Sequence, residues 1–229
     1  MYGYIWSYTP PLIPLVETPQ LENAVRKSVY CLAAIKRYVT IYCMKRDAIL
    51  AALRLLGQYA KEEGIKLEVS IYGGTAFMLA YNTREATRDE DAILIPKEEG
   101  ERFVLKVAKE MDLEPDWLNS NVRQFVSPKV EAKRRLAEIE DQTGLIIQVP
   151  TARYLLAMKA LACRKSIGTY PGDMEDLSYL IKKMEIRSVE EIQEAIDVFY
   201  PDDVIRSQDA KRLKGLIDEY EEREKKPLD

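Results

Sequence analysis

The sequence predicts an α+β fold, with α/β-like alternation in its first part and a helical C-terminal half. Short runs typical of strands, most clearly 67–72, 87–95 and 145–149, alternate with segments of helical periodicity. After Pro150 the remaining segments have helical periodicity alone. Strands that alternate with helices early, followed by helices alone, are typical of this class.

Composition excludes several kinds of chemistry. The 229 residues suffice for one large domain or two small ones. With 34 Lys and Arg against 38 Asp and Glu, the net charge is −4, so there is no overall basic signal for nucleic-acid binding. Histidine is absent. Its absence excludes Ser-His-Asp and Cys-His catalysis and any His-ligated zinc site.

The cysteines and the hydropathy pattern bear on the compartment. Cys31, Cys43 and Cys163 show no paired spacing, which argues against a disulfide framework and fits a reducing environment. No apolar run reaches the roughly 18 residues that a membrane-spanning helix needs. The N-terminus lacks the basic start and apolar centre of a signal peptide. We therefore expect a cytoplasmic protein without a membrane partner.

The first 43 residues differ from the rest. Residues 1–19 are rich in Tyr and Pro, which predicts an extended arm, and a helix is expected over 20–42. Every residue that we assign to chemistry lies after Met44. Residues 1–43 are therefore either an accessory segment or the product of an over-long start assignment.

The elements of the first part follow from local patterns. Apolar residues at helical spacing predict helices, and apolar runs rich in β-branched residues predict strands. In chain order we expect a helix from Met44 to near Gly64, a strand at 67–72, a glycine turn at 73–74, a helix at 75–80, a strand at 87–95, a helix at 97–111, a loop at 115–119 anchored by Trp117, a strand at 122–126, a charged helix or hairpin at 129–140 and a buried strand at 145–149.

The second part begins with a strong helix start. Thr151 is placed to cap the helix that follows Pro150, and Ser188 with Glu191 forms a capping box. In chain order we expect a helix at 152–165, a loop at 166–172, a helix at 173–184, a helix from Ser188 to about Phe199 and a charged helix at about 207–225.

Two aspartates in the second predicted strand suggest a metal site. Side chains alternate along a strand, so Asp89 and Asp91 would project from the same face. Two carboxylates that close repel each other unless a cation lies between them or one takes a proton. Oxygen-only ligands favour a hard cation such as Mg²⁺. The upstream turn at Gly73-Gly74 would let a helix N-terminus hold a phosphate. The combination indicates phosphoryl or nucleotidyl transfer.

These residues resemble those of a known superfamily. The pattern Gly73-Gly74-x-Ala76, followed by Arg84-x-x-Thr87-x-Asp89-x-Asp91, resembles the polymerase-β-like nucleotidyltransferases. The chain is similar to their small stand-alone branch related to AbiEii-type toxins of abortive-infection and toxin–antitoxin systems. That branch has a Leu-Leu-x-x-Lys helix and an Asp-x-x-Asp-Leu helix. The matching runs here are Pro150 to Arg164, with Leu155, Leu156 and Lys159, and Asp173-x-x-Asp176-Leu177.

The resemblance covers roughly 47–200 and implies both architecture and activity. It implies a small mixed β-sheet nucleotidyltransferase core flanked by helices, here 44–150, followed by a helical region, 151–229. The implied activity is Mg²⁺-dependent transfer of NMP from a nucleoside triphosphate to a tRNA 3′ end or to a protein hydroxyl. A toxin function, with a cognate antitoxin as partner, is a further implication.

The resemblance also implies roles for single residues. Asp89 and Asp91 would hold the metal and, with Lys159, form the catalytic set. Gly73, Gly74, Thr75, Arg84, Thr87, Asp173 and Asp176 would bind the nucleotide.

Each of these assignments has a purely structural alternative. The aspartates would then be solvated acids at a strand start, and the glycines a tight turn. Lys159 would be a lysine that reaches the surface from an apolar helix. Asp173 and Asp176 would simply favour a helix N-terminus.

Two departures from the superfamily pattern favour an alternative function. A third carboxylate is expected on a later strand, but the run at 145–149 offers Gln148 and no acid. Glu90 occupies a position that is usually apolar. Because a buried unpaired carboxylate is costly, Glu90 must be exposed, paired with Arg84 or Arg88, or functional. The alternative is a catalytically impaired member that acts as a nucleotide-sensing or partner-binding module.

Overall fold

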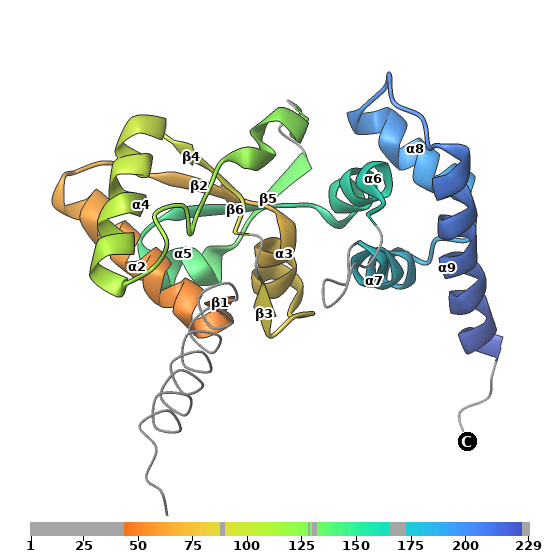
Figure 1. Ribbon diagram of the computed structural model, residues 1–229, viewed down its shortest axis with the longest axis horizontal. Coiled ribbons are helices and arrows are strands. Elements are labelled where there is room, and N and C mark those ends of the chain that lie inside the picture. Colours follow the sequence, from red (N-terminus) through yellow and green to blue (C-terminus); the bar gives the residue numbers. More distant parts are fainter. Residues whose placement is uncertain (1–43, 88–89, 128, 130–131, 165–172, 226–229) are drawn as a thin grey trace, which may run out of the picture. The chain divides into compact units, whose positions relative to one another are not determined.

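The computed structural model describes residues 44–87, 90–127, 129, 132–164 and 173–225 (Figure 1). In chain order the elements are β1 Met44–Lys45, α2 Arg46–Glu62, β2 Glu68–Ile71, α3 Gly73–Ala76, the π-helical turn η1 Phe77–Tyr81, β3 Ala86–Thr87, β4 Ala92–Ile95, α4 Lys97–Met111, the 3₁₀ turn η2 Asn121–Phe125, β5 Lys133–Arg135, α5 Ala137–Thr143, β6 Ile146–Pro150, α6 Ala152–Ala162, α7 Met174–Met184, α8 Val189–Phe199 and α9 Ser207–Lys225.

A mixed sheet of four strands forms the first part and confirms the predicted α+β class. Its order is β4-β2-β6-β5, and β2 runs antiparallel to β4 and parallel to β6. The strand β5 pairs antiparallel with β6. After β6 the chain is mostly helical, as expected. The arm and helix predicted for residues 1–43 lie outside the described residues.

One face of the sheet carries the first hydrophobic core. Val69 and Ile147 are fully buried on this face, together with Leu94. Helices α2, α4 and α5 contribute the other side of this core (Figure 1). Trp117 anchors the loop after α4, as predicted, because it is buried and its Nε1 donates to the carbonyl of Val104 at 3.1 Å.

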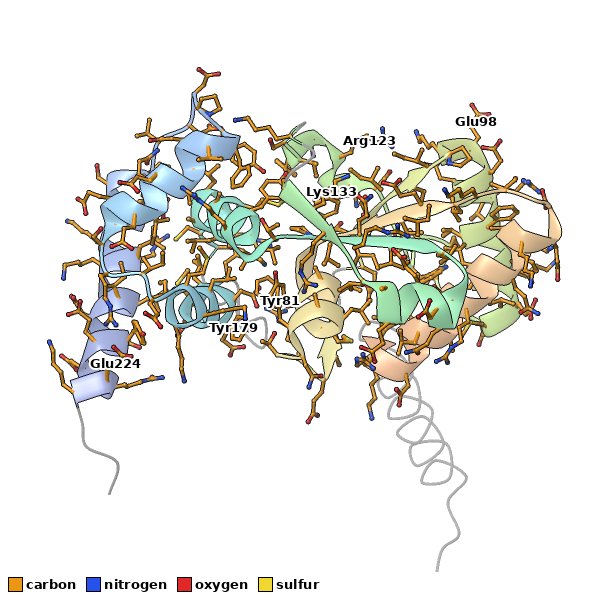
Figure 2. The ribbon with its side chains drawn as sticks, turned by 180° about the vertical axis from the view of Figure 1, so that it is seen from behind. Tyr81, Glu98, Arg123, Lys133, Tyr179 and Glu224 are labelled. Atoms are coloured by element: carbon orange, nitrogen blue, oxygen red, sulfur yellow. The ribbon has the colours of Figure 1, made fainter. Side chains whose placement is uncertain are left out.

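The second core is helical. It joins apolar side chains of α6, α7, α8 and α9 to Tyr72 at the end of β2 and to Phe77 in η1. Tyr81 and Tyr179 meet edge to face where η1 lies beside α7, with ring centroids 6.0 Å apart (Figure 2). None of the described helices is both long enough and apolar enough to span a membrane.

Both predicted helix starts in the C-terminal half are confirmed. Thr151 accepts a hydrogen bond from the Tyr154 amide at 3.3 Å, and Ser188 accepts one from the Glu191 amide at 3.2 Å. The return bond of the capping box differs from the expected form, because Glu191 accepts from the amide of Arg187.

Three element predictions in the first part are wrong in detail. Met44 begins a short strand that pairs with Thr87, and the helix starts at Arg46. The strand expected over 87–95 is divided, because Thr87 belongs to β3 and the pairing with β2 begins at Ala92. The helix after β2 starts at Gly73, two residues earlier than expected.

The segment expected to be a strand at 122–126 is instead the 3₁₀ turn η2. The side chain of Asn119 accepts a hydrogen bond from the amide of Asn121 at 3.0 Å, at the first residue of the turn. At 129–140 the sequence predicts a charged helix or a hairpin. The structure has a strand and a helix there, since β5 pairs antiparallel with β6 and α5 lies between them in the chain.

The contact between α2 and α5 gives a prediction of stability. A Cβ at Gly57 would lie 1.8 Å from the carbonyl oxygen of Thr143. Replacing an interior helix glycine by alanine normally stabilises a helix by about 0.5–1 kcal/mol. We expect Gly57→Ala to destabilise the protein instead, by about 1–3 kcal/mol, because the two helices must move apart. Urea unfolding followed by circular dichroism measures the change.

Gly215→Ala in α9 is the matched control, because a Cβ there meets no atom within 4 Å. It should follow the ordinary helix rule and leave the protein as stable as the wild type or slightly more stable. A Gly57→Ala variant that gains stability to the same extent would refute the close packing of α2 on α5.

Candidate active site

Backbone hydrogen bonds fix Asp91 beside the glycine turn. The amide of Tyr72, the last residue before the turn, donates to the carbonyl of Asp91 at 2.8 Å. On its other side the Asp91 segment is held by Asn119, whose carbonyl accepts from Ala92 at 2.7 Å. Gly73 and Asp91 both line one cavity. The structure therefore brings the turn and the second predicted aspartate together.

Gly73 and Gly74 are required for different reasons, the first for its backbone conformation and the second for close packing. Gly73 has φ of 58°, in the left-handed region that favours glycine. At Gly74 a Cβ would lie 2.0 Å from Thr87 Oγ1 and 3.2 Å from Arg84 Nη1. The turn thus packs directly against the segment that leads to the aspartates. Thr75 and Thr87, both predicted to bind nucleotide, are buried, and each has an interaction partner.

Lys159 lies at the centre of a buried ion-pair cluster. Its Nζ lies 2.8 Å from Asp173 Oδ1 and 2.8 Å from Asp176 Oδ2. Arg84 Nη2 lies 2.5 Å from Asp176 Oδ1, and Arg164 donates from its amide and its Nε to Asp173 Oδ2. Lys159 is only 6 % exposed, so it does not reach the surface as a solvated lysine would. Four of the predicted site residues therefore form one cluster.

In this cluster, ion pairs and hydrogen bonds shift the pKa values more than burial does. Burial alone would lower the pKa of Lys159, but the carboxylates of Asp176 and Asp173 leave that pKa raised. Burial alone would raise the pKa of Asp173, but hydrogen bonds from Arg164 and the charge of Lys159 leave it lowered. Three cations against two carboxylates leave the five side chains with one net positive charge.

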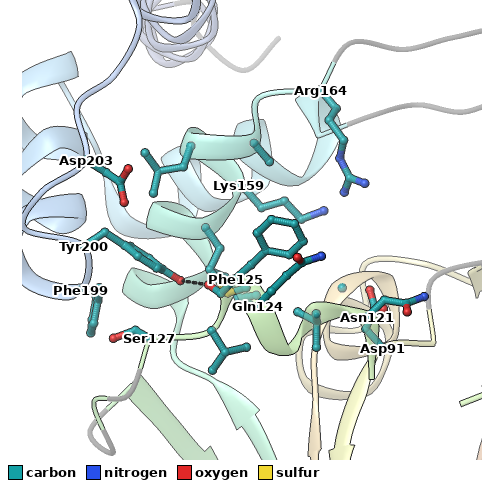
Figure 3. Close-up of a pocket in the computed structure, with 17 residues that line it drawn as sticks. Asp91, Asn121, Gln124, Phe125, Ser127, Lys159, Arg164, Phe199, Tyr200 and Asp203 are labelled. Atoms are coloured by element: carbon teal, nitrogen blue, oxygen red, sulfur yellow. Dashed lines mark hydrogen bonds between the residues drawn. The ribbon is translucent and has the colours of Figure 1, made fainter. Parts of the chain in front are cut away.

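The cavity has a volume of about 750 Å³, which is within the range of small-molecule sites. Figure 3 shows Asp91 and Asn121 on one side of it and Tyr200 with Asp203 on the other. Lys159 lies between these sides. Arg164 also lines the cavity. One part of the cavity is therefore charged and the other is largely aromatic and apolar.

The predicted metal pair is described only in part. Asp89 lies outside the described residues, so its pairing with Asp91 stays a prediction. Within the described ranges, no group of three or more Cys, Asp or Glu side chains is arranged to hold a metal ion. Glu90 is 8 % exposed and has an interaction partner, which excludes the solvent-exposed alternative for this residue.

The later strand carries a neutral amide where a third acid was sought. Gln148 lies opposite Ser70 in the parallel pairing of β2 with β6. Ser70 Oγ donates to Gln148 Oε1 at 3.5 Å and accepts from Lys133 Nζ at 3.1 Å. Lys133 lies on the edge strand β5 (Figure 2). Glu140 on α5, the helix that precedes β6, forms an ion pair with Arg135.

Sequence reasoning missed the wall of the cavity formed by η2 and the end of α8. Asn121, Gln124 and Phe125 line it, but the sequence predicts a strand at 122–126 instead of this 3₁₀ turn. Tyr200 and Asp203 line it as well, at a point where the sequence indicated only a helix end. No motif marks these residues. The exposed Phe125 could have been suspected only after the 3₁₀ turn was known.

A comparison with protein-family models identifies the class as nucleotidyltransferase, through a match over residues 49–227. Because the match spans more than half of the chain, the protein belongs to the family described as nucleotidyltransferase of unknown function (DUF6036). No curated protein and no solved structure gives a significant match. The predicted class is confirmed and implies a nucleotide substrate. The finer resemblance to AbiEii-type toxins stays a prediction.

The position of Lys159 gives a prediction for stability. We expect Lys159→Met to destabilise the protein by about 3 kcal/mol, because the buried carboxylates of Asp173 and Asp176 each lose an ion-pair partner. Denaturant unfolding measures the loss. Lys214→Met is the matched control, since Lys214 is an exposed helix lysine paired with Asp218, and it should unfold like the wild type. Equal stabilities for the two variants would contradict the buried cluster.

The lowered pKa of Asp173 predicts a pH dependence. A carboxyl whose pKa is lower in the folded state stabilises the protein above its unfolded pKa, about 3.9, and the contribution is lost as the pH falls through the folded pKa. Asp173→Asn should therefore differ most from the wild type in free energy of unfolding near neutral pH. The difference in free energy of unfolding between the variant and the wild type should become smaller as the pH falls below about 4. A gap that stays constant down to pH 2.5 in urea titrations would refute this assignment.

Proposed function

We propose that this protein is a Mg²⁺-dependent nucleotidyltransferase that moves NMP from a nucleoside triphosphate to a hydroxyl acceptor. The observation that carries the proposal is the shared cavity, which is lined by Gly73 and Asp91 from the sheet and by Lys159 and Arg164 from the helical half. Family membership supports the reaction class, and the charges of these residues support the location.

The chain's own residues would bind and orient the triphosphate. Lys159 has three N–H donors and faces two carboxylates, which leaves donor capacity for a phosphate oxygen. Arg164 would provide a second cation at the cavity wall. The net positive charge of the cluster would stabilise the charge that develops on the transferred group and on the departing pyrophosphate.

The donor set suits the proposed cofactor. Asp91 offers carboxylate oxygens at the cavity wall, and Asp89 would complete the pair. Bound Mg²⁺ would supply Lewis-acid neutralisation of the phosphate oxygens. In the reaction the acceptor oxygen bonds to the α-phosphorus, the bond from that phosphorus to pyrophosphate breaks, and the hydroxyl proton is released.

The acceptor and biological role are proposed from sequence resemblance alone. The run from Pro150 to Arg164 and the Asp173-x-x-Asp176-Leu177 motif are similar to the AbiEii-related branch. They support a tRNA 3′ end or a protein hydroxyl as acceptor, and a toxin function with a cognate antitoxin.

One observation favours a second candidate function. Gln148, held by Ser70, gives the sheet an amide at the position where active relatives are expected to have an acid. A chain with an incomplete carboxylate set would bind a nucleotide without turnover, as a nucleotide-sensing or partner-binding module. Calorimetry that finds tight NTP binding, together with no transfer, would favour this alternative.

Transfer of label from α-³²P NTPs tests the main proposal. Each NTP is incubated with Mg²⁺ and with either total RNA or cell protein. We expect labelled product with the wild type and at least a roughly 100-fold lower rate with Asp91→Asn or Asp89→Asn, the scale of one electrostatic contact to the transition state. Asp218→Asn, an exposed acid on α9, should react like the wild type. No transfer by the wild type, or undiminished transfer by Asp91→Asn, would count against the proposal.

A further inference from the structure

Phe125 presents an aromatic ring at the wall of the cavity. We propose that this ring is the platform on which the nucleobase of the bound triphosphate stacks, an inference that rests on the proposed function. The exposed fraction of Phe125 is 63 %, which is high for an aromatic side chain of this size. The other exposed large apolar residues among those described are Ile95, Leu105 and Val204. Phe125 is the one of these four that lines the cavity.

The backbone under this ring is fixed by the helical half. Tyr200 donates its hydroxyl to the carbonyl of Phe125 at 2.9 Å, and Tyr154 accepts from the amide of Ser127 at 2.5 Å. The two tyrosine hydroxyls lie 3.1 Å apart. Burial, and then the bond with Tyr154, raises the pKa of Tyr200, so its hydroxyl stays protonated as a donor. The exposed ring therefore projects from a backbone that is already positioned, which lowers the cost of binding a ligand against it.

The place of Phe125 within the cavity suits a base joined to a triphosphate. Figure 3 shows Phe125 and Gln124 between the side with Asp91 and the side with Tyr200, and both line the same cavity as Lys159. Phosphates held near Lys159 would place the attached nucleoside along the aromatic part of the cavity. The Gln124 amide offers both a donor and an acceptor beside the ring.

The chemistry predicts a contact that is general for bases. Every nucleobase has a π face, and stacking on an aromatic side chain contributes about 1–3 kcal/mol per base. Phe125 should therefore strengthen the binding of all four NTPs. A ligand without a base should be indifferent to it. Inorganic tripolyphosphate is such a ligand and carries the same phosphate chain.

Isothermal titration calorimetry in Mg²⁺ tests the inference with ATP, GTP, CTP, UTP and tripolyphosphate. We expect Phe125→Ala to weaken NTP binding by about 5- to 150-fold while tripolyphosphate binding stays within twofold of the wild type. Phe125→Trp should restore NTP affinity. Leu105→Ala, which changes another exposed apolar residue, on α4, is the matched control and should change neither affinity. If Phe125→Ala does not fold by circular dichroism, Phe125→Leu replaces it as the variant without a π face.

The outcomes separate the two proposals. If the wild type binds neither NTPs nor tripolyphosphate, the proposed function fails and this inference falls with it. If the wild type binds both, and the Phe125 variant keeps its NTP affinity or loses both ligands equally, the stacking role is refuted and the proposed function stands. If the Phe125 variant keeps its NTP affinity but has a raised KM for the acceptor, the stacking role is also refuted, because the ring would then contact the acceptor.

Discussion

The buried pairing of Lys159 with Asp173 and Asp176 is the interaction on which the candidate site depends. Removing an ammonium and two carboxylates from water costs several kcal/mol per ion, and the cost is offset only when each charge keeps its partners. Arg84 forms a second ion pair with Asp176, and Arg164 forms a second ion pair with Asp173. The pairing ties α6 and α7 to the segment that follows η1. The same cluster thus fixes both the helical half and the approach to the aspartates.

The cavity beside this ion-pair cluster has two chemically different parts. The sheet contributes Gly73 and Asp91 through backbone pairing at the end of β2. The helical half contributes the cations and also the aromatic wall around Tyr200. A nucleotide has the same division, with charge at the phosphates and a flat apolar surface at the base. The nucleotide that we propose as substrate would place its phosphates in the charged part of the cavity and its base in the aromatic part.

Sequence patterns predicted the features that depend on neighbours along the chain. The caps at Thr151 and Ser188 and the strand β6 are features of this kind. The turn η2 does not follow from neighbouring residues alone, because the hydroxyl of Tyr200, distant in the sequence, donates to the carbonyl of Phe125 within it. Helical periodicity likewise placed Lys159 on an apolar helix but could not show its two acidic partners on the next one. The sequence motifs named Lys159, Asp173 and Asp176, but only the fold shows that their side chains form ion pairs.

The acidic partners of Lys159 raise the question of how much that lysine contributes to catalysis. Without them a buried ammonium would lose its proton more easily, because burial alone lowers its pKa. The carboxylates keep the charge in place but also weaken its field at the cavity. Arg164 has a more exposed side chain, at 53 %, and shares only Asp173 with Lys159. We therefore propose different tasks for the two cations: Lys159 would fix the position of a phosphate, and Arg164 would neutralise the charge that moves onto the leaving pyrophosphate.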